Sequence, residues 1–192
     1  MATETVTRHY QEIMLDIESL SLQPDALVLS IGAQTFTCES CVGPAIGGDL
    51  LLVPSMTQQI IAGRHVDQGT QQWWAEQPAE ARLHWQAPLK ENSVGEALVR
   101  LADFCKGADH IWANGICFDI TVLEHLFRQN GVKVPWKYNA VRDARTVYDT
   151  GCIGSVEKRE YVGPLSKDLV PHHPVHDCTQ QIIRLWEAGY SR

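Results

Sequence analysis

Two carboxylates placed two residues apart, at the end of an apolar segment, constrain this chain more than any other feature of its sequence. Residues 13–17 are rich in strand-forming side chains, and Asp16 and Glu18 stand at the end of that segment. In a strand, residues i and i+2 point to the same face, so these two side chains would lie together where the strand leaves the core. Like charges held there repel each other and lose hydration, and Mg²⁺ or Mn²⁺ would relieve both costs. Taken alone, Asp-x-Glu also fits a strand that ends in a solvated turn.

Apolar periodicity and turn signals predict a single layer of sheet covered by helices, in an α/β or α+β fold. Strands are expected at residues 13–17, 26–36, 49–54 and 110–113, and the first two are expected to form a hairpin. Loops are expected at residues 37–48, 88–93, 132–140 and 151–171. Helices are expected at residues 55–63, 71–77, 79–85, 94–105, 118–129, 142–148 and 173–188, with Thr70 and Ser93 as caps. The first three strands therefore form an antiparallel section of the sheet.

Length and composition indicate one domain over residues 1–192, with a core of about residues 9–188. No apolar run approaches the ~18 residues that cross a bilayer, and no signal peptide is apparent, so we expect a cytoplasmic protein without membrane contact. The six cysteines are scattered: Cys38, Cys41, Cys105, Cys117, Cys152 and Cys178. The CxxC at 38–41 lacks a second pair at zinc-finger spacing, so reduced thiols are favoured over zinc or redox use.

The net charge is −7, from 23 acidic and 16 basic residues. This balance argues against a broad, sequence-blind electrostatic grip on nucleic acid. It does not exclude an enzyme that takes a phosphodiester through bound metal ions, because acidic ligands make the metal-free protein negative and cations restore the balance at the site.

A second motif, Asn114-Gly-Ile-Cys-Phe-Asp119, follows a predicted buried strand and opens a predicted helix. A strand, a glycine turn and an aspartate at a helix start place a carboxylate at the rim of the sheet, where ligands of α/β proteins gather. The helix dipole alone also favours an aspartate there, so a structural role for Asp119 remains the alternative.

The third motif gathers three histidines, His172, His173 and His176, around Asp177 at the start of the last predicted helix. His172 lies just before this helix and Asp177 about one turn inside it, so both side chains can reach the same side. An imidazole beside a metal-binding carboxylate provides a general base near neutral pH.

Together, Asp16-x-Glu18, Asn114-x3-Phe118-Asp119 and His172-x4-Asp177 resemble the DEDD superfamily of 3'-5' exonucleases (DnaQ-like, RNase T-like), in its DEDDh branch. More closely, the chain is similar to phage exonuclease A and to the bacterial 3'-5' exoribonuclease-like group. The three motifs occur in the right order, about a hundred and then about sixty residues apart. The likeness runs from about residue 9 to 186, with supporting stretches at 63–64, 73–77, 111–119 and 142–146.

The resemblance implies an RNase H-like fold, a mixed sheet flanked by helices, and two divalent metals, Mg²⁺ or Mn²⁺, per active site. It implies that Asp16 bridges both metals, that Glu18 and Asp177 complete the site holding the attacking water, and that Asp119 completes the other. His172 would take the proton from that water. His173 and His176 are alternatives for this role, and the spacing favours His172.

The resemblance also implies contacts to the substrate, for which the candidates are Leu20, Asn114, Phe118, Trp73, Trp74 and Arg145. Leu20 would wedge against the terminal base, and Arg145 would bind phosphate unless it is structural. Because adjacent helix positions cannot both face the core, at least one of the two tryptophans is expected to be exposed, where it could stack on a base. Asp143 is interpreted as a cap or ion-pair residue, with contact to the site as the alternative.

We therefore expect a metal-dependent 3'-5' exonuclease that releases 5'-mononucleotides from single-stranded 3' ends or 3' overhangs of RNA or DNA. The motifs do not encode a contact to the 2'-hydroxyl, so the preferred sugar stays open. A proofreading activity on DNA is less favoured, because the chain has no polymerase domain. The alternative of another class is a nucleic-acid-end binding module with weak or no catalysis. A homodimer is compatible with the resemblance.

Overall fold

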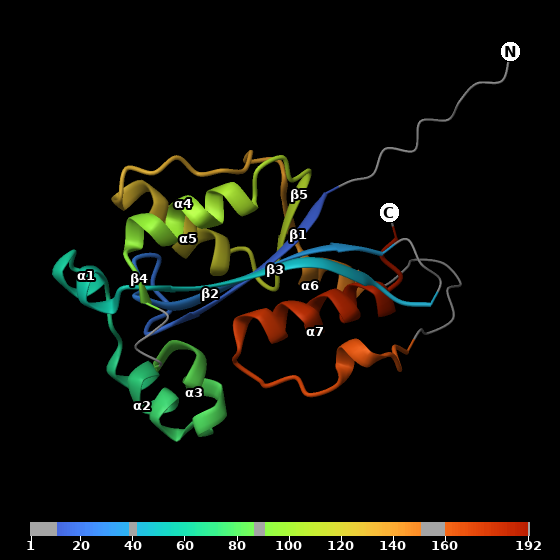
Figure 1. The fold of residues 1–192 in the computed structure, drawn as a ribbon, viewed down its shortest axis with the longest axis horizontal. Coiled ribbons are helices and arrows are strands. Elements are labelled where there is room, and N and C mark those ends of the chain that lie inside the picture. The colour runs from blue at the N-terminus through green and yellow to red at the C-terminus, as the bar shows by residue number, and fades with distance from the viewer. Residues whose placement is uncertain (1–10, 39–41, 87–90, 151–159, 192) are drawn as a thin grey trace, which may run out of the picture.

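The computed structural model describes residues 11–38, 42–86, 91–150 and 160–191, in which helices cover both faces of one mixed sheet (Figure 1). The CxxC interpretation falls partly outside these residues, because Cys41 is not among them, and neither is Cys152.

The sheet of the described chain has the strand order β4-β3-β2-β1-β5-β6. The strands are β1 (Glu12–Ser19), β2 (Val28–Thr37), β3 (Ala45–Pro54), β4 (Glu91–Asn92), β5 (His110–Ala113) and β6 (Val141–Asp143). β2 is antiparallel to both β1 and β3, whereas β5 is parallel to β1 and β6 is parallel to β5. The predicted α/β fold with three antiparallel strands at its beginning is confirmed.

Helices α4 and α5 lie on one face of the sheet and α6 and α7 on the other, while α2 and α3 lie beyond one end of it (Figure 1). The helices are α1 (Met56–Ile61), α2 (Gln68–Glu76), α3 (Ala79–Gln86), α4 (Val94–Phe104), α5 (Asp119–Gln129), α6 (Ala144–Thr150) and α7 (Pro174–Glu187), with a 3-10 turn η2 (Pro164–Ser166). Ser93 caps α4 as predicted, since its side chain accepts the Glu96 N–H.

Strand β1 divides its side chains between the two faces of the sheet. One set of alternate residues packs in the core under α4 and α5, namely Ile13, Leu15 and Ile17. Met14 packs on the other side, in the core beneath α7. Because side chains alternate along a strand, Asp16 and Glu18 follow Met14 on the α7 face. The predicted shared face of the two carboxylates is thus the face that α7 covers.

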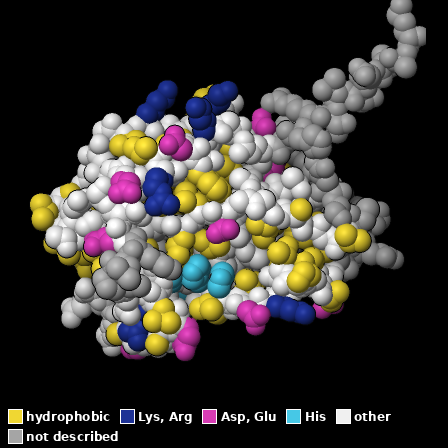
Figure 2. Space-filling view, in the orientation of Figure 1, with side chains coloured by type: hydrophobic (Ala, Val, Ile, Leu, Met, Phe, Trp, Pro, Cys, Tyr) yellow, Lys and Arg dark blue, Asp and Glu magenta, His cyan; other side chains and the backbone are white. Residues whose placement is uncertain are grey.

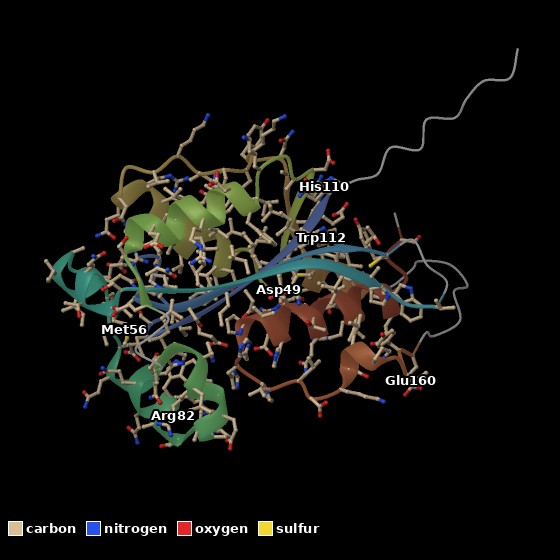
Figure 3. The ribbon with its side chains drawn as sticks, in the orientation of Figure 1. Asp49, Met56, Arg82, His110, Trp112 and Glu160 are labelled. Atoms are coloured by element: carbon tan, nitrogen blue, oxygen red, sulfur yellow. The ribbon has the colours of Figure 1, made fainter. Side chains whose placement is uncertain are left out.

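The opposite end of β1 carries a buried carboxylate that is fully paired. Glu12 accepts hydrogen bonds from His110 Nδ1 at 2.8 Å and from Trp112 Nε1 at 2.5 Å, both on β5 (labelled in Figure 3). These bonds join the parallel strands β1 and β5 at this end of β1, so the Glu12 carboxylate has a structural role.

The start of α7 lies directly on the backbone of β2 at Gly32. A Cβ atom at Gly32 would lie 2.4 Å from the carbonyl carbon of Pro174 and 2.7 Å from the amide nitrogen of Val175. Gly32 pairs with Asp16 across the β1–β2 ladder. The absent side chain therefore lets the first turn of α7 rest beside the carboxylates of β1.

Strand β3 begins at Ala45, four residues before the predicted Asp49, so the prediction of a loop through residue 48 is wrong at its end. Gly47 and Gly48 are strand residues that accommodate Thr35 of β2. The Thr35 hydroxyl accepts the Gly48 N–H at 2.7 Å, and a Cβ at Gly47 would lie 2.5 Å from the same oxygen. These glycines serve a close cross-strand contact rather than a turn.

Three further differences from the prediction concern α2, α6 and β4. Helix α2 begins three residues earlier than predicted, because Asp67 rather than Thr70 is its cap and accepts the Thr70 N–H at 2.7 Å. The predicted helix at 142–148 begins only at residue 144, since residues 141–143 form β6 beside β5. In the predicted loop at 88–93, residues 91–92 pair with β3 as β4.

The contact at Gly32 predicts a stability effect. Gly32→Ala should lower the free energy of unfolding by about 1–3 kcal/mol, because the new methyl group overlaps backbone atoms of α7 that cannot rotate away. Urea unfolding followed by circular dichroism measures this change. Gly95→Ala is the matched control: it lies in the first turn of α4 with nothing within 4 Å of the added Cβ, so it should be neutral or stabilising by up to about 1 kcal/mol. Equal midpoints for wild type and Gly32→Ala would contradict the contact.

Candidate active site

Four carboxylates from three elements converge at one end of β1. Asp16 and Glu18 come from β1, Asp119 is the first residue of α5, and Asp177 lies in the first turn of α7. Asp16 interacts electrostatically with both Asp119 and Asp177, and Glu18 with the other three. The structure thus brings together the carboxylates of all three sequence motifs.

Asp119 is held by the strand beside it. β5 ends at Ala113, whereas β1 continues to Ser19, so the end of β1 has no parallel partner on that side. The Ile17 N–H donates to Asp119 Oδ1 at 3.2 Å and takes the place of the next ladder bond. The carboxylate is buried by this arrangement, so Asp119 has a structural contact and also faces the site.

His172 and Asp177 are joined across the start of α7. The His172 N–H donates to Asp177 Oδ2 at 3.0 Å, and His172 has a φ of 61°, a left-handed conformation that is uncommon for a residue other than glycine. Pro174 begins α7, as predicted for an early helix turn. Ligating atoms of Glu18, His172 and Asp177 all lie within 4.8 Å of one another. The predicted approach of His172 to Asp177 is confirmed.

The two neighbouring histidines, His173 and His176, contact each other, and His173 also contacts α3. His173 stacks on His176 with ring centroids 4.1 Å apart and contacts His84 of α3 at 4.6 Å. His176 Nδ1 accepts the Val170 N–H at 2.9 Å. Figure 2 shows histidine side chains gathered at the surface between α3 and the start of α7. Of the three candidates, it is His172 that groups with Glu18 and Asp177.

Burial raises the pKa of every carboxyl group in the cluster, and repulsion between the carboxylates adds to the rise at Asp16 and Glu18. Burial is the main cause at Asp16, whose pKa rises well above its ordinary value, and the charges of Asp119 and Asp177 add to it. The pKa of Glu18 rises to about 10 from burial and then from Asp16, Asp177 and Asp119. Burial raises the pKa of Asp119 to about 7, although the hydrogen bond from Ile17 opposes the shift.

The pKa of Asp177 is subject to opposing effects, because burial raises it while nearby His172 lowers it. When all four carboxyl groups are ionised, the cluster would hold more negative charge than the nearby Arg145 and His172 can compensate. Carboxylate and imidazole donors around such a charge fit a hard divalent cation, with Asp16, Glu18, Asp119 and Asp177 as the residues that would hold it.

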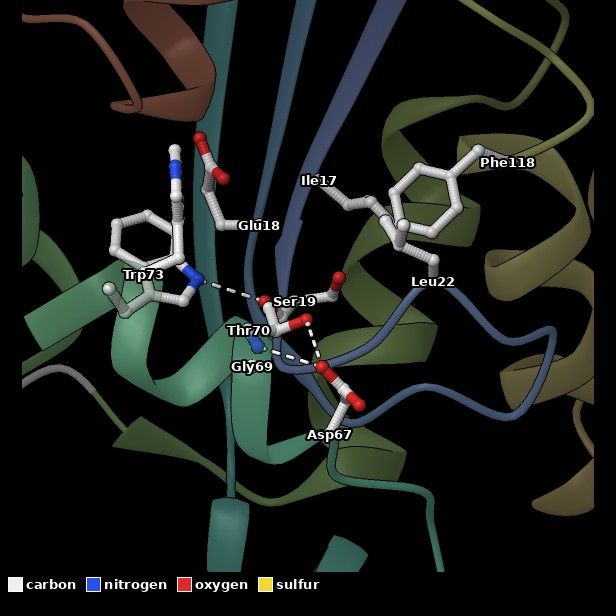
Figure 4. A pocket seen from close by; sticks show the side chains of 10 residues that line it. Ile17, Glu18, Ser19, Leu22, Asp67, Gly69, Thr70, Trp73 and Phe118 are labelled. Carbon is white, nitrogen blue, oxygen red and sulfur yellow. Dashed lines mark hydrogen bonds between the residues drawn. The ribbon is translucent and has the colours of Figure 1, made fainter.

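A pocket of about 430 Å³ adjoins the carboxylates (Figure 4). Glu18 and Ser19 line it on one side, and it has apolar walls from Leu22, Trp73 and Phe118. Its floor comes from the beginning of α2, where Asp67 accepts hydrogen bonds from Thr70. The predicted Phe118 thus faces a cavity, and Leu22 is a wall residue that the sequence analysis missed.

The two tryptophans divide as predicted into one exposed and one buried residue. Trp73 is 41% exposed and its ring contacts the His172 ring, with centroids 4.9 Å apart. Trp74 is 3% exposed, and its Nε1 donates to the Ser19 carbonyl at 2.9 Å. Trp73 therefore presents an aromatic face to the pocket, while Trp74 fixes α2 against the end of β1.

The remaining predicted contacts lie at the edges of this site. Leu20 packs against a buried cluster formed by Leu27, Leu29, Trp74 and Ala81 and is not among the pocket-lining residues that the structure describes. Arg145 donates from Nε to Asn114 Oδ1 at 3.3 Å, and its charge acts on Asp119. Asp143 accepts the Arg145 N–H at 2.9 Å at the start of α6, as expected of a cap.

The sequence analysis also missed a polar side chain that contacts the cluster directly. Gln181, one turn after Asp177 on α7, donates from Nε2 to Asp16 Oδ1 at 2.7 Å. Its position four residues after Asp177 could have indicated the same helix face, but not the partner on β1.

Residues 11–188 match the family model of the 3'-5' exoribonuclease Rv2179c-like domain. The chain belongs to this family. The match includes all three motifs, so the chain contains a 3'-5' exonuclease domain. No curated protein sequence is similar enough to the chain to count as a match.

Solved structures with the same fold are forms of E. coli exonuclease I. The zinc-ion-bound complex of that enzyme with single-stranded DNA is 12% identical, with a TM-score of 0.62. Its complex with a dA16 oligonucleotide is 13% identical, with a TM-score of 0.60. Each match covers 94% of this chain and 40% of the exonuclease I chain. The likeness confirms the RNase H-like fold. Among the described residues, no helix has both the length and the apolar composition to cross a membrane.

The raised pKa of Glu18 predicts that the metal-free protein loses stability as pH rises. The ordinary pKa is 4.5 and the folded one about 10, so between these values the folded state keeps a proton that the unfolded state gives up. The stabilisation is complete below about pH 4.5 and is lost as pH approaches 10, with a slope of up to ~1.4 kcal/mol per pH unit. Denaturant unfolding in a chelator from pH 5 to 9 measures it.

Glu18→Gln should flatten that slope and stabilise the metal-free protein at pH 8, whereas Glu76→Gln, at an exposed position of α2, should leave it unchanged. Added Mn²⁺ should reverse the trend, because metal binding requires ionised ligands and strengthens with pH. Parallel pH profiles for wild type and Glu18→Gln would disprove the protonation of Glu18 in the folded state.

Proposed function

We propose that this protein is a metal-dependent 3'-5' exonuclease, a single domain that removes 5'-mononucleotides from single-stranded 3' ends or 3' overhangs. One observation carries the proposal: ligating atoms of Glu18, His172 and Asp177 lie within 4.8 Å of one another, at the mouth of a pocket with aromatic walls. Reactive groups and a cavity for a base adjoin each other there, as the removal of a terminal nucleotide requires.

In this proposal the four carboxylates hold two divalent cations, Mg²⁺ or Mn²⁺, in the DEDDh arrangement. When bound, such cations activate a water and stabilise the leaving oxygen of an in-line displacement. Asp16 interacts electrostatically with both Asp119 and Asp177, as its assignment as the shared ligand requires. Glu18 and Asp177 serve the side next to His172, and Asp119 serves the other.

His172 is the proposed general base. Its backbone N–H is bound to Asp177 and its ring is flanked by Trp73 and Trp74, with centroids 4.9 Å and 6.0 Å away. Both contacts restrict the imidazole, which leaves it beside Glu18, where a water to be deprotonated would lie. An imidazole in that place can act as a general base toward such a water.

The pocket next to Glu18 is the proposed site of the 3'-terminal nucleotide. Trp73 and Phe118 offer aromatic faces, and base stacking of this kind does not depend on sequence. Arg145, exposed and fixed by Asn114, is placed to meet phosphate beside Asp119. The motifs leave the sugar open, whereas the family description favours RNA. Single-stranded RNA is therefore the first substrate to test, and DNA the second.

Activity is tested with 5'-labelled single-stranded RNA and the matching DNA, in Mn²⁺ or Mg²⁺. A ladder of 3'-shortened products is expected, and Asp16→Ala or a chelator should abolish it. His172→Ala should reduce kcat about 100- to 10,000-fold, which is the usual contribution of a general base. Asp49→Ala is the matched control, an exposed aspartate of β3 (labelled in Figure 3), and should retain full activity. Binding of both strands without any ladder would refute the enzyme and leave an end-binding module.

The pocket predicts a role for Trp73 in substrate affinity. Trp73→Ala should raise KM about 5- to 150-fold, because base stacking contributes ~1–3 kcal/mol, and Trp73→Phe should restore most of it. Steady-state kinetics with a short single-stranded oligonucleotide measure the effect. Tyr138→Ala provides the control, since this aromatic residue is exposed in the loop before β6. If Trp73→Ala and Tyr138→Ala have the same KM, the base does not occupy this pocket.

A further inference from the structure

Three of the four carboxylates accept a hydrogen bond from another residue of the protein. The Ile17 N–H holds Asp119, the His172 N–H holds Asp177, and the side chain of Gln181 holds Asp16. Among the described residues, Gln181 is the one donor to Asp16. The other two donors are backbone groups. Gln181 is therefore the one of these three donors that an amino-acid substitution can remove.

The orientation of the Gln181 amide is fixed by chemistry. Asp16 binds a cation in its ionised form, which only accepts hydrogen bonds, so in that form the group that faces Asp16 Oδ1 at 2.7 Å is the NH₂ end. The bond opposes the rotation that repulsion from Asp119 and Asp177 would otherwise cause. Asp16 is thereby kept directed into the cluster while the cluster is still uncompensated.

The other end of the same amide is unsatisfied. Gln181 is 6% exposed, and its Oε1 is buried without a hydrogen-bond partner in the described chain. Leaving a buried acceptor unpaired destabilises the folded protein. A glutamine kept for packing alone would be replaced by an apolar side chain of the same shape at less cost.

A second buried glutamine on the same helix interface lacks this feature. Gln34 of β2 is 5% exposed, and its Oε1 accepts the Thr179 hydroxyl at 3.0 Å. The Oε1 of Gln34 is thus paired within the protein. Gln181 donates from Nε2 to Asp16, but its Oε1 has no partner in the described chain. The difference indicates that the partner of Gln181 Oε1 arrives from outside.

We propose that Gln181 is a positioning residue whose Nε2 orients Asp16 and whose Oε1 accepts a hydrogen bond from a water of the hydrated divalent cation. The inference rests on the proposed function, since it assumes that Asp16 binds a cation. Water is the donor that such a cation brings, and it supplies the hydrogen that the buried carbonyl lacks. The acidic cluster and the unpartnered Gln181 oxygen are separate observations that point to the same ligand.

The test measures Mn²⁺ affinity by isothermal titration calorimetry, with thermal unfolding in chelator beside it. Gln181→Met keeps the shape and removes both hydrogen-bonding ends, so it should weaken Mn²⁺ binding about 10- to 100-fold while leaving metal-free unfolding unchanged or later. Activity should recover when Mn²⁺ is raised by the same factor. Gln34→Met is the matched control and should lower the unfolding temperature without changing Mn²⁺ affinity.

Wild-type Mn²⁺ affinity in Gln181→Met, with an active wild-type enzyme, overturns the role of Gln181 and leaves the exonuclease intact. A loss of affinity that merely follows a lower unfolding temperature, as in Gln34→Met, also overturns it. Absence of Mn²⁺ binding by the wild-type protein refutes the metal-dependent function and this inference together.

Discussion

The contact between the start of α7 and the backbone of Gly32 determines whether this site exists. A Cβ there would lie 2.4 Å from Pro174, so only a residue without a side chain allows the helix to reach the sheet. The first turn of α7 carries Asp177, and His172, which lies just before this helix, donates its N–H to Asp177. A shift of this helix would separate both from Asp16, although every side chain of the motif would still be present.

The carboxylate cluster destabilises the folded, metal-free protein when its groups are ionised. Burial is the main cause that raises the pKa of Asp16, Glu18 and Asp119, and repulsion between the carboxylates adds to it at Asp16 and Glu18. The contrast with Glu12 at the other end of β1 is informative. That carboxylate is just as buried, yet His110 and Trp112 satisfy both of its oxygens. The same strand thus has one carboxylate paired within the protein and others whose partner must come from solution.

Sequence patterns predict those parts of the site that depend on local geometry. The period of two along β1 places Asp16 with Glu18, and the spacing around one helix turn places His172 with Asp177. Contacts across elements were not predictable: Gly32 looks like an ordinary strand glycine, Leu22 an ordinary loop residue, and Gln181 an ordinary helix residue. The start of α2 was also misplaced, because Thr70 and Asp67 are both good caps and only the structure decides between them.

Net charge and site geometry together explain how an acidic protein can act on a polyanion. With a net charge of −7, the chain offers little general attraction to nucleic acid. In the proposed function, cations at the carboxylates reverse the charge where the phosphate must lie, and the apolar pocket binds the uncharged base next to it. The bound cation would then favour binding of nucleic acid, because it offsets the repulsion between carboxylates and phosphate. By linkage, bound nucleic acid would favour binding of the cation to the same extent. Strands that present a free 3' end would be selected because the pocket admits a terminal base, without a basic groove along the chain.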